Sequence, residues 1–122
     1  MRKLQGDRAT AEQCHIRLEE ASPLLPTPDG KRSLALFEHG TLQVKLYAPR
    51  GTDLQSPHTR DEIYVIASGA GWFVNGAERH RFAPHDVLFV RAGIVHRFEE
   101  FSDDFRAWVF FYGPEGGESD GA

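Results

Sequence analysis

The sequence predicts an all-β fold in which short antiparallel strands form a barrel or a sandwich. Short apolar runs, several of them alternating with polar residues, recur between turns rich in glycine, proline, asparagine and aspartate. Helical periodicity is almost absent. Hydrophobic residues make up 40% of the 122 residues, and nine of these are Phe, so the chain can bury one aromatic-rich core.

The first 32 residues are expected to form a strand followed by a loop. Cys14, Ile16 and Leu18 alternate with polar residues, which is typical of a short half-buried strand. The segment 21–31 contains three prolines and one glycine, so we expect an irregular loop there.

The barrel is predicted to span residues 33–112. Its strands are expected at 33–38, 41–48, 62–67, 72–74, 80–83, 87–90, 94–98 and 105–112. In the second of these strands, Leu42, Val44 and Leu46 share one face. Asn75-Gly76 is a strong signal for a tight hairpin. The glycine-rich, acidic segment 113–122 is expected to be a flexible tail.

The residues best suited to chemistry lie just before and within the third of these strands. If residues 56–66 form one strand, alternation places Ser56, His58 and Glu62 on the same face. His58 and Glu62 are of metal-ligating types, and His96 can complete a set of two histidines and one carboxylate. That donor set suits non-haem iron and related divalent ions.

This pattern resembles the two motifs of the cupin superfamily. His58 and Glu62 match the second histidine and the glutamate of the first motif, and Gly69 matches its closing glycine. Gly93 and His96 match the glycine and the histidine of the second motif. The resemblance implies a small single-domain cupin, a jelly-roll β-barrel also called a double-stranded β-helix. It further implies a divalent metal ion and a homodimer.

The chain departs from the cupin motifs at several positions. Ser56 replaces the first histidine of the first motif, which leaves three protein ligands. In the second motif, His85, Arg91 and Glu100 stand where cupins have glycine, proline and asparagine. The resemblance therefore identifies the fold but not a reaction.

A carboxylate at position 62 needs a partner if it faces the interior. Such a group costs several kcal/mol in an apolar barrel unless it is paired or coordinated, and an ion with two imidazoles removes that cost. The position vacated at Ser56 is then held by water or substrate, which gives an open site of the catalytic kind, or Gln55 turns in to fill it. In the alternative interpretation the barrel binds no metal, and Arg60 forms an ion pair with Glu62.

Several further side chains are candidates for the wall of a ligand pocket. They either share a strand face with a proposed ligand or belong to the aromatic last strand: Arg60, Tyr64, Phe98, Glu100 and Trp108. Trp108 shares its face with Phe110 and Tyr112, and parity leaves open whether this face or that of Val109 and Phe111 lies inside. An aromatic-lined barrel mouth suits an apolar or aromatic small molecule.

The composition argues against nucleic-acid and membrane partners. Lys and Arg number 14 against 18 Asp and Glu, a formal net charge of −4, and they form no basic patch. No apolar run approaches the length of a membrane span, and no signal-peptide pattern is present. The single Cys14 cannot form an intrachain disulfide, so we expect a cytoplasmic protein.

Two classes of function remain open. In the first, the protein is a metal-dependent enzyme with dioxygenase, isomerase or lyase activity on a small organic molecule, and its ion is Fe, Mn, Ni or Zn. In the second, it is a non-catalytic domain that binds or senses a small ligand, with or without metal. The sequence assigns no residue a catalytic role beyond the proposed ligands.

Overall fold

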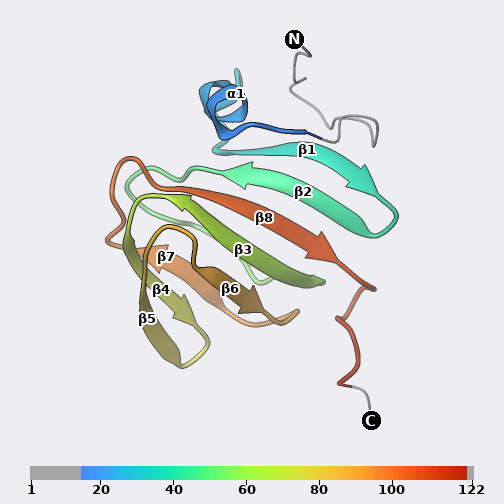
Figure 1. The fold of residues 1–122 in the computed structure, drawn as a ribbon. Coiled ribbons are helices and arrows are strands. Elements are labelled where there is room, and N and C mark those ends of the chain that lie inside the picture. Colours follow the sequence, from blue (N-terminus) through green and yellow to red (C-terminus); the bar gives the residue numbers. More distant parts are fainter. Residues whose placement is uncertain (1–14, 121–122) are drawn as a thin grey trace.

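A computed structural model describes residues 15–120 and confirms the predicted all-β fold (Figure 1). Its strands are β1 (Ser33–His39), β2 (Leu42–Tyr47), β3 (Asp61–Ser68), β4 (Gly71–Asn75), β5 (Glu78–Phe82), β6 (Val87–Val90), β7 (His96–Glu99) and β8 (Arg106–Tyr112). A short helix α1 (Leu18–Ala21) and a 3-10 turn η1 (Ser22–Leu24) precede them. Within this part of the chain no helix is long and apolar enough to cross a membrane.

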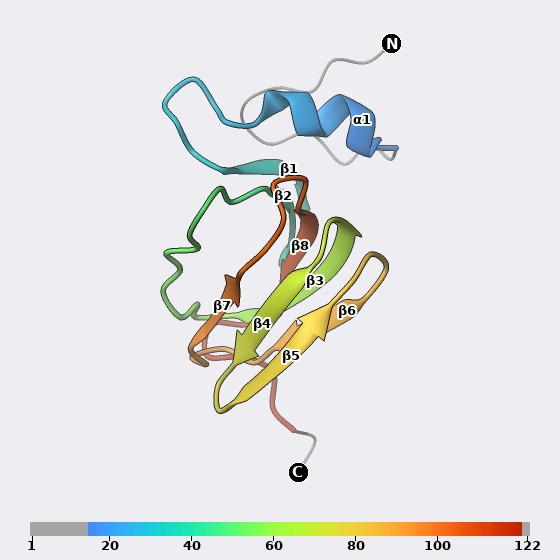
Figure 2. The same ribbon diagram turned by 90° about the vertical axis from the view of Figure 1, so that its left-hand side faces the viewer.

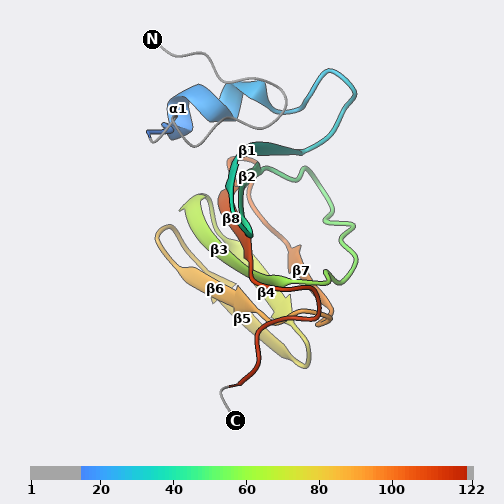
Figure 3. The same cartoon turned by 90° about the vertical axis from the view of Figure 1, so that its right-hand side faces the viewer.

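The strands form two antiparallel sheets, as a jelly roll requires. The larger sheet has the order β1-β2-β8-β3-β6 and the smaller has the order β5-β4-β7. Strands far apart in sequence are therefore neighbours, because the last strand, β8, pairs with both β2 and β3. Figures 2 and 3 show the smaller sheet at the end of the molecule away from α1.

Turn chemistry explains where the strands of the smaller sheet begin. The predicted hairpin at Asn75-Gly76 is confirmed: it joins β4 to β5, pairs Asn75 with Glu78, and has a φ of +61° at Gly76. Gly69, between β3 and β4, has a φ of +84°, and a Cβ there would lie 2.6 Å from the Cα of Phe105. A side chain at position 69 would strain the backbone and collide with the chain entering β8.

The main core lies between the two sheets and is rich in aromatic side chains. Its buried members are Tyr64, Ile66, Phe73, Phe82, Val90, Phe98, Phe105, Ala107, Val109 and Phe111. Phe98 is central, since its ring centroid lies 4.9 Å from that of Tyr64 and 4.6 Å from that of Phe105. Aromatic pairs at these separations stabilise the fold beyond their buried area.

A second core covers the outer face of the larger sheet, where α1 lies over β1 (Figures 1 and 2). Its buried members come from the N-terminal segment, β1 and β2: Ala21, Leu25, Leu34, Leu36, Val44, Leu46 and Ala48. The apolar face of β2 thus packs under α1 and η1. The opposite face of β2, with Lys45 and Tyr47, points into the barrel.

The strand predicted over Cys14–Leu18 is wrong in the part that the structure describes. Leu18 opens α1, while Cys14 lies outside the described residues. The loop predicted over 21–31 likewise begins with the end of α1 and with η1. Ile16 and Leu18 pack against the second core. Three alternating apolar residues are too short a pattern to separate a strand from the approach to a helix.

The segment 113–120, for which the sequence predicts a flexible tail, contacts the barrel. The amide of Gly116 donates to the carbonyl of Thr59 at 2.6 Å. The amide of Glu118 donates to Oδ2 of Asp61 at 2.8 Å. In both bonds the segment contributes a backbone amide, so its glycine-rich composition gives no sign of them.

Candidate metal centre

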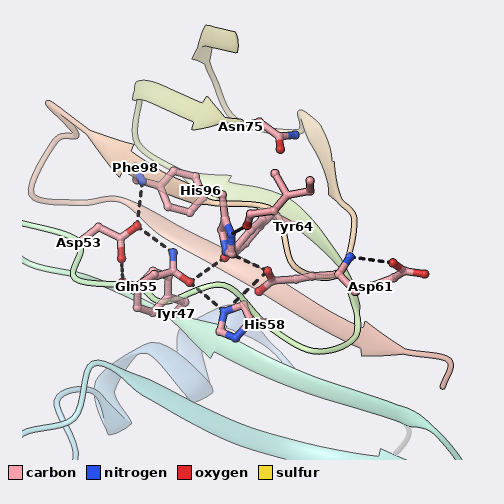
Figure 4. A network of polar contacts seen from close by, with 12 residues as sticks. Tyr47, Asp53, Gln55, His58, Asp61, Tyr64, Asn75, His96 and Phe98 are labelled. Carbon is pink, nitrogen blue, oxygen red and sulfur yellow. Dashed lines mark hydrogen bonds and ion pairs between the residues drawn. The ribbon is translucent and has the colours of Figure 1, made fainter. Parts of the chain in front are cut away.

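The three residues predicted as metal ligands converge on one place, and Figure 4 shows the two histidines among them, His58 and His96. Glu62 is the second residue of β3, His96 is the first residue of β7, and His58 lies in the loop between β2 and β3. One candidate ligand atom from each lies within 4.8 Å of the other two. The structure therefore assembles the proposed donor set.

His58 reaches the site from a loop and not from a strand. Strand alternation brings His58 and Glu62 to one face only if residues 56–66 form one strand, but β3 begins only at Asp61. The carbonyl of His58 accepts a hydrogen bond of 2.7 Å from the amide of Gly93, which fixes this part of the loop. Nε2 of His58 lies 3.9 Å from Oε1 of Glu62. His58 therefore lies beside Glu62 as predicted, but a loop conformation places it there and not strand alternation.

The imidazole of His96 is oriented by its own chain. Its Nδ1 lies 2.9 Å from the carbonyl oxygen of Ile94. A carbonyl only accepts, so Nδ1 carries the proton of the neutral ring and Nε2 presents a lone pair. The Nε2 atom lies 3.2 Å from Oε1 of Glu62. Metal-ligating histidines are commonly held by a backbone carbonyl in this way.

Two atoms at the centre of the site are buried and have no hydrogen-bond partner among the described residues. They are Oε1 of Glu62 and Nε2 of His96, whose side chains are 2% and 0% exposed. Nε2 and Oε1 are 3.2 Å apart, and their lone pairs repel unless a proton or a cation lies between the two atoms. Atoms bound to one ion at about 2.0–2.2 Å lie roughly 3–3.5 Å apart, so this pair fits a shared ion.

The two histidines differ in their electrostatic surroundings. Burial lowers the pKa of His58, and the nearby carboxylate of Glu62 offsets only part of this effect. Burial also disfavours the imidazolium of His96, but the contact with Glu62 and the bond to Ile94 outweigh it, so the pKa of His96 is raised. A proton on Nε2 of His96 is therefore the competitor of a metal ion there.

A second buried carboxylate, that of Asp53, lies beside the site and is fully hydrogen-bonded. Its Oδ2 accepts from the amide of Phe98 and from Nε2 of Gln55, both at 2.8 Å, and its Oδ1 accepts from the hydroxyl of Tyr47. The hydroxyl of Tyr64 donates to the amide oxygen of Gln55 at 3.0 Å. Burial and the Asp53 carboxylate raise the pKa of Tyr47, which keeps this phenol protonated as a donor.

The two residues proposed for a fourth ligand position lie at different depths. Ser56 is exposed and lines the rim of a cavity beside the ligands. Gln55 is partly buried, and its Oε1 lies 3.3 Å from Nε2 of His58. Strand parity predicts that Gln55 points away from the site, but it belongs to the loop, where parity does not hold.

Tyr64 is the member of the predicted pocket wall that does line this cavity. Phe98 lies in the main core, with its backbone amide bonded to Asp53. Trp108 lies on the outer face of β8 and packs against the second core. The inner face of β8 instead carries Val109 and Phe111, which settles the choice that parity leaves open.

Arg60 and Glu100, also predicted to line the pocket, are not among the residues of its wall, although Cζ of Arg60 lies 5.9 Å from the ring centroid of Phe111, which is. Arg60 donates to the carbonyl of Thr41 and forms no ion pair with Glu62. Glu100 is exposed, and its Oε2 lies 2.7 Å from Nη2 of Arg79. Both predictions fail because Arg60 precedes β3 and Glu100 follows β7, so neither residue keeps the strand's alternation.

A cavity of about 280 Å³ adjoins His58 and Glu62. Its walls include Lys45 and Tyr47 from β2, which the sequence analysis did not identify. A larger and shallower hollow of about 740 Å³ lies beside α1 and contains none of the proposed ligands. A third hollow of about 640 Å³ touches His58 from the side of Gly93 and Gly116 but not Glu62. Among these three, the smallest cavity alone reaches two of the proposed ligands.

Known proteins resemble this chain in sequence and in fold. Residues 47–113 match the model of the AraC-like ligand-binding domain. An uncharacterised protein of Streptomyces coelicolor is 36% identical over 102 residues, which are 82% of this chain and 96% of that protein. The sequence match extends over the loop of His58 and over both strands that carry Glu62 and His96.

Solved structures share the barrel. A Thermus thermophilus protein has a TM-score of 0.65 and 21% identity, covering 82% of this chain and 98% of its own. A cupin-2 domain protein of Shewanella frigidimarina has a TM-score of 0.64 and 13% identity, covering 84% and 98%. The DMSP lyase DddQ of Ruegeria pomeroyi has a TM-score of 0.56 and 27% identity, covering 64% and 41%. The predicted cupin jelly roll is confirmed.

Proposed function

This chain belongs to the family of AraC-like ligand-binding domains, and we propose that it is a metal-binding cupin acting on a small organic molecule. The ion is held by His58, Glu62 and His96, and the organic molecule enters the cavity beside them. Fe, Mn, Ni and Zn all suit a set of two imidazoles and one carboxylate.

The observation that carries this proposal is the pair of buried atoms that lack a partner. Oε1 of Glu62 and Nε2 of His96 are both acceptors, and burying either one unpaired is costly. A single cation between them compensates both atoms at once and brings the nearby Nε2 of His58 into the same set.

The surrounding residues decide how a substrate reaches the centre. Glu62 and His96 are enclosed, whereas His58 is about one-third exposed and faces the cavity, so approach is from the side of His58. Val109 and Phe111 make that wall apolar and limit the water near the ligands. A bound ion would supply Lewis-acid or redox chemistry to the molecule held there.

Dioxygenase, isomerase and lyase activities all follow from such a centre. The fold shared with a DMSP lyase supports an enzymatic function of this kind. The second candidate is a non-catalytic domain that senses a small ligand, and the match to AraC-like ligand-binding domains favours it. Turnover that depends on the metal supports the enzyme, whereas ligand-induced thermal stabilisation without turnover supports the sensor.

Metal analysis of the purified protein tests the proposal. Protein isolated without chelator or added metal should carry close to one ion per chain by mass spectrometry. His58→Ala and His96→Ala should each abolish binding, and His80→Ala, at an exposed position on β5, should not. Full occupancy in either of the first two variants would exclude this site.

We further propose that the protein is a cytoplasmic homodimer. β6 is an edge strand of the larger sheet, and its outward side chains Val87 and Phe89 are 66% and 45% exposed. An apolar edge of this kind invites pairing with a second copy. Light scattering should report a dimer at micromolar concentration, and Phe89→Asp should weaken it. A stable wild-type monomer would contradict the assignment.

No nucleic-acid partner is proposed for this chain. Its 14 basic residues are outnumbered by 18 acidic ones. A gel-shift assay at about 150 mM salt, where charges are screened over roughly 8 Å, should show no complex with duplex DNA. A sequence-dependent shift at low micromolar protein would overturn the small-molecule function.

A further inference from the structure

One wall of the cavity carries a lysine that the proposed metal site does not use. Lys45 lies in the middle of β2, opposite Val109 of β8, and its side chain lines the same cavity as His58 and Glu62. Within residues 15–120 it forms no hydrogen bond and no ion pair. Burial lowers the pKa of Lys45, and the charge of Glu62 offsets part of this effect. The ammonium group of Lys45 is thus partly desolvated in the cavity wall and has no hydrogen-bond or ion-pair partner among the described residues.

The two tyrosines of the cavity cannot donate to a ligand. Tyr47 gives its single hydroxyl proton to Asp53, and Tyr64 gives its proton to Gln55. Lys45 offers three N–H donors, none of which has a partner among the described residues. It is therefore the strongest unused donor beside the candidate centre.

Charge and size narrow the ligand that this cavity can take. A divalent ion with Glu62 and two neutral imidazoles keeps one positive charge, and Lys45 adds a second. The nearby carboxylate of Asp53 already accepts three hydrogen bonds, so the unpaired charge at the cavity wall is positive and favours an anion. The volume of about 280 Å³ equals about nine water volumes of roughly 30 Å³ each, which suits a molecule of about ten non-hydrogen atoms or fewer. The apolar walls at Leu54, Val109 and Phe111 suit a short carbon skeleton.

We propose that Lys45 binds the carboxylate of the substrate, and that the substrate is a small organic acid. Its carboxylate pairs with Nζ of Lys45, and the other end of the molecule reaches the side of the cavity formed by His58 and Glu62. The preference for an anion counts the charge of the proposed ion and so rests on the proposed function; the place of Lys45 in the cavity wall, without a hydrogen-bond or ion-pair partner among the described residues, does not. A lysine that is costly to desolvate and has no structural partner is explained by a ligand that supplies the missing charge.

Ligand titrations of four protein forms test this assignment: the wild type, Lys45→Met, Lys45→Arg and Lys31→Met. The probes are butyrate, 3-hydroxybutyrate and benzoate, each compared with its neutral amide, and methyl phosphate as a different anion. Titrations are made by calorimetry on zinc-loaded and on chelator-treated protein. Lys31→Met is the matched control, because Nζ of Lys31 is exposed and lies 3.8 Å from Asp29.

At least one carboxylate should bind the wild type more tightly than its amide. Lys45→Met should weaken that binding about 10- to 100-fold, the range expected for loss of one hydrogen bond to a charged group. Lys45→Arg should retain most of the affinity, and Lys31→Met should retain all of it. The melting temperature of Lys45→Met should equal or exceed that of the wild type, because a partly desolvated charge is removed.

Three results would overturn the assignment. They are equal carboxylate affinity in the wild type and Lys45→Met, equal affinity for the acid and its amide, and no carboxylate binding to the wild type below about 10 mM. Binding of methyl phosphate alone would also reject the carboxylate class. Zinc content separates this inference from the proposed function, since Lys45→Met should hold as much zinc as the wild type. If the wild type holds no zinc but still binds carboxylates through Lys45, the metal proposal fails and the assignment of Lys45 stands.

Discussion

Two buried carboxylates lie in the same barrel and differ in how many partners they have. Asp53 is 7% exposed and Glu62 is 1% exposed, so burial does not distinguish them. Asp53 accepts three hydrogen bonds, from Tyr47, Gln55 and the amide of Phe98. Oε1 of Glu62 has none within the described residues. A buried acid with every partner in place is part of the structure, whereas one without partners marks a place for a ligand.

The two carboxylates are nevertheless connected. Asp53 lies in the loop 48–60 and bonds to the backbone of β7, the strand that begins with His96. The same loop carries His58. Asp53 therefore links the segments that carry two of the three proposed ligands, His58 and His96 (Figure 4). Oε1 of Glu62 lies 3.2 Å from Nε2 of His96 and 3.9 Å from Nε2 of His58.

The largest effect on stability is expected from Asp53→Ala. The change leaves the buried amide of Phe98 and the hydroxyl of Tyr47 without partners, which should lower the free energy of unfolding by about 3 kcal/mol. Urea denaturation measures it. Tyr47→Phe, which removes one of the bonds, should cost about 1 kcal/mol. If Asp53→Ala lowered the free energy of unfolding by less than about 1 kcal/mol, Asp53 would not have the structural role that distinguishes it from Glu62 here.

A smaller loss is expected for Asp61→Ala. Asp61 accepts from the amides of Ala92 and Glu118, so the change should cost about 1–2 kcal/mol at pH 7 and release the segment 113–120. These amides lower the pKa of Asp61. A lowered pKa gives stability that is present above the unfolded value of about 3.9 and is lost as the pH falls through the folded value.

The deficit of Asp61→Ala should therefore shrink in acid. Asp103→Ala, at an exposed position, provides the control and should leave stability unchanged at pH 7. Urea denaturation at pH 7 and at about pH 3 separates the two cases. A deficit that is the same at both values would show that the carboxylate charge plays no part.

Glu62→Gln should change the stability of metal-free protein only slightly. The amide keeps the volume of the side chain and removes a buried charge whose Oε1 accepts no hydrogen bond among the described residues and lies 3.2 Å from Nε2 of His96. The free energy of unfolding should stay within about 0.5 kcal/mol of the wild type or rise above it. A loss as large as that of Asp53→Ala would mean that Glu62 has a structural role.

Ser56→His should leave metal-free stability unchanged, because Ser56 is exposed. If Ser56 marks the place of the missing cupin histidine, the new imidazole should strengthen metal binding about tenfold, which is about 1.4 kcal/mol. Competition with a chelator measures the dissociation constant, and Ser56→Ala is the control. An unchanged constant would count against the motif alignment.

The sequence predicts the ligand set but not its surroundings. His58, Glu62 and His96 were identified from a motif, and motif spacing holds whether His58 lies in a strand or in a loop. Lys45 was not predicted as a cavity residue, because Leu42, Val44 and Leu46 on the other face of its strand form the apolar face, which is ordinarily the inner one. That face is buried under α1, and the polar face lines the barrel. Alternation shows that a strand has two faces, but only the tertiary structure shows which one is enclosed.

The same limit applies to the two ends of the chain. Short alternation before residue 18 did not reveal α1, and a glycine-rich composition did not reveal the bond between Glu118 and Asp61. The strands between Ser33 and Tyr112 were predicted well because turn residues such as Asn75-Gly76 act locally. A backbone amide that bonds to a residue distant in the sequence leaves no local signal.

The most direct test of a shared ion at Glu62 and His96 is the unfolding free energy as a function of metal concentration. Zinc should stabilise the wild type by about 2.7 kcal/mol at a concentration one hundred times its dissociation constant, and a chelator should reverse the effect. Glu62→Gln and His96→Ala should show no stabilisation at the same zinc concentrations, while Asp103→Ala should behave like the wild type. Equal stabilisation of all four proteins, or none in the wild type, would contradict the metal centre proposed here.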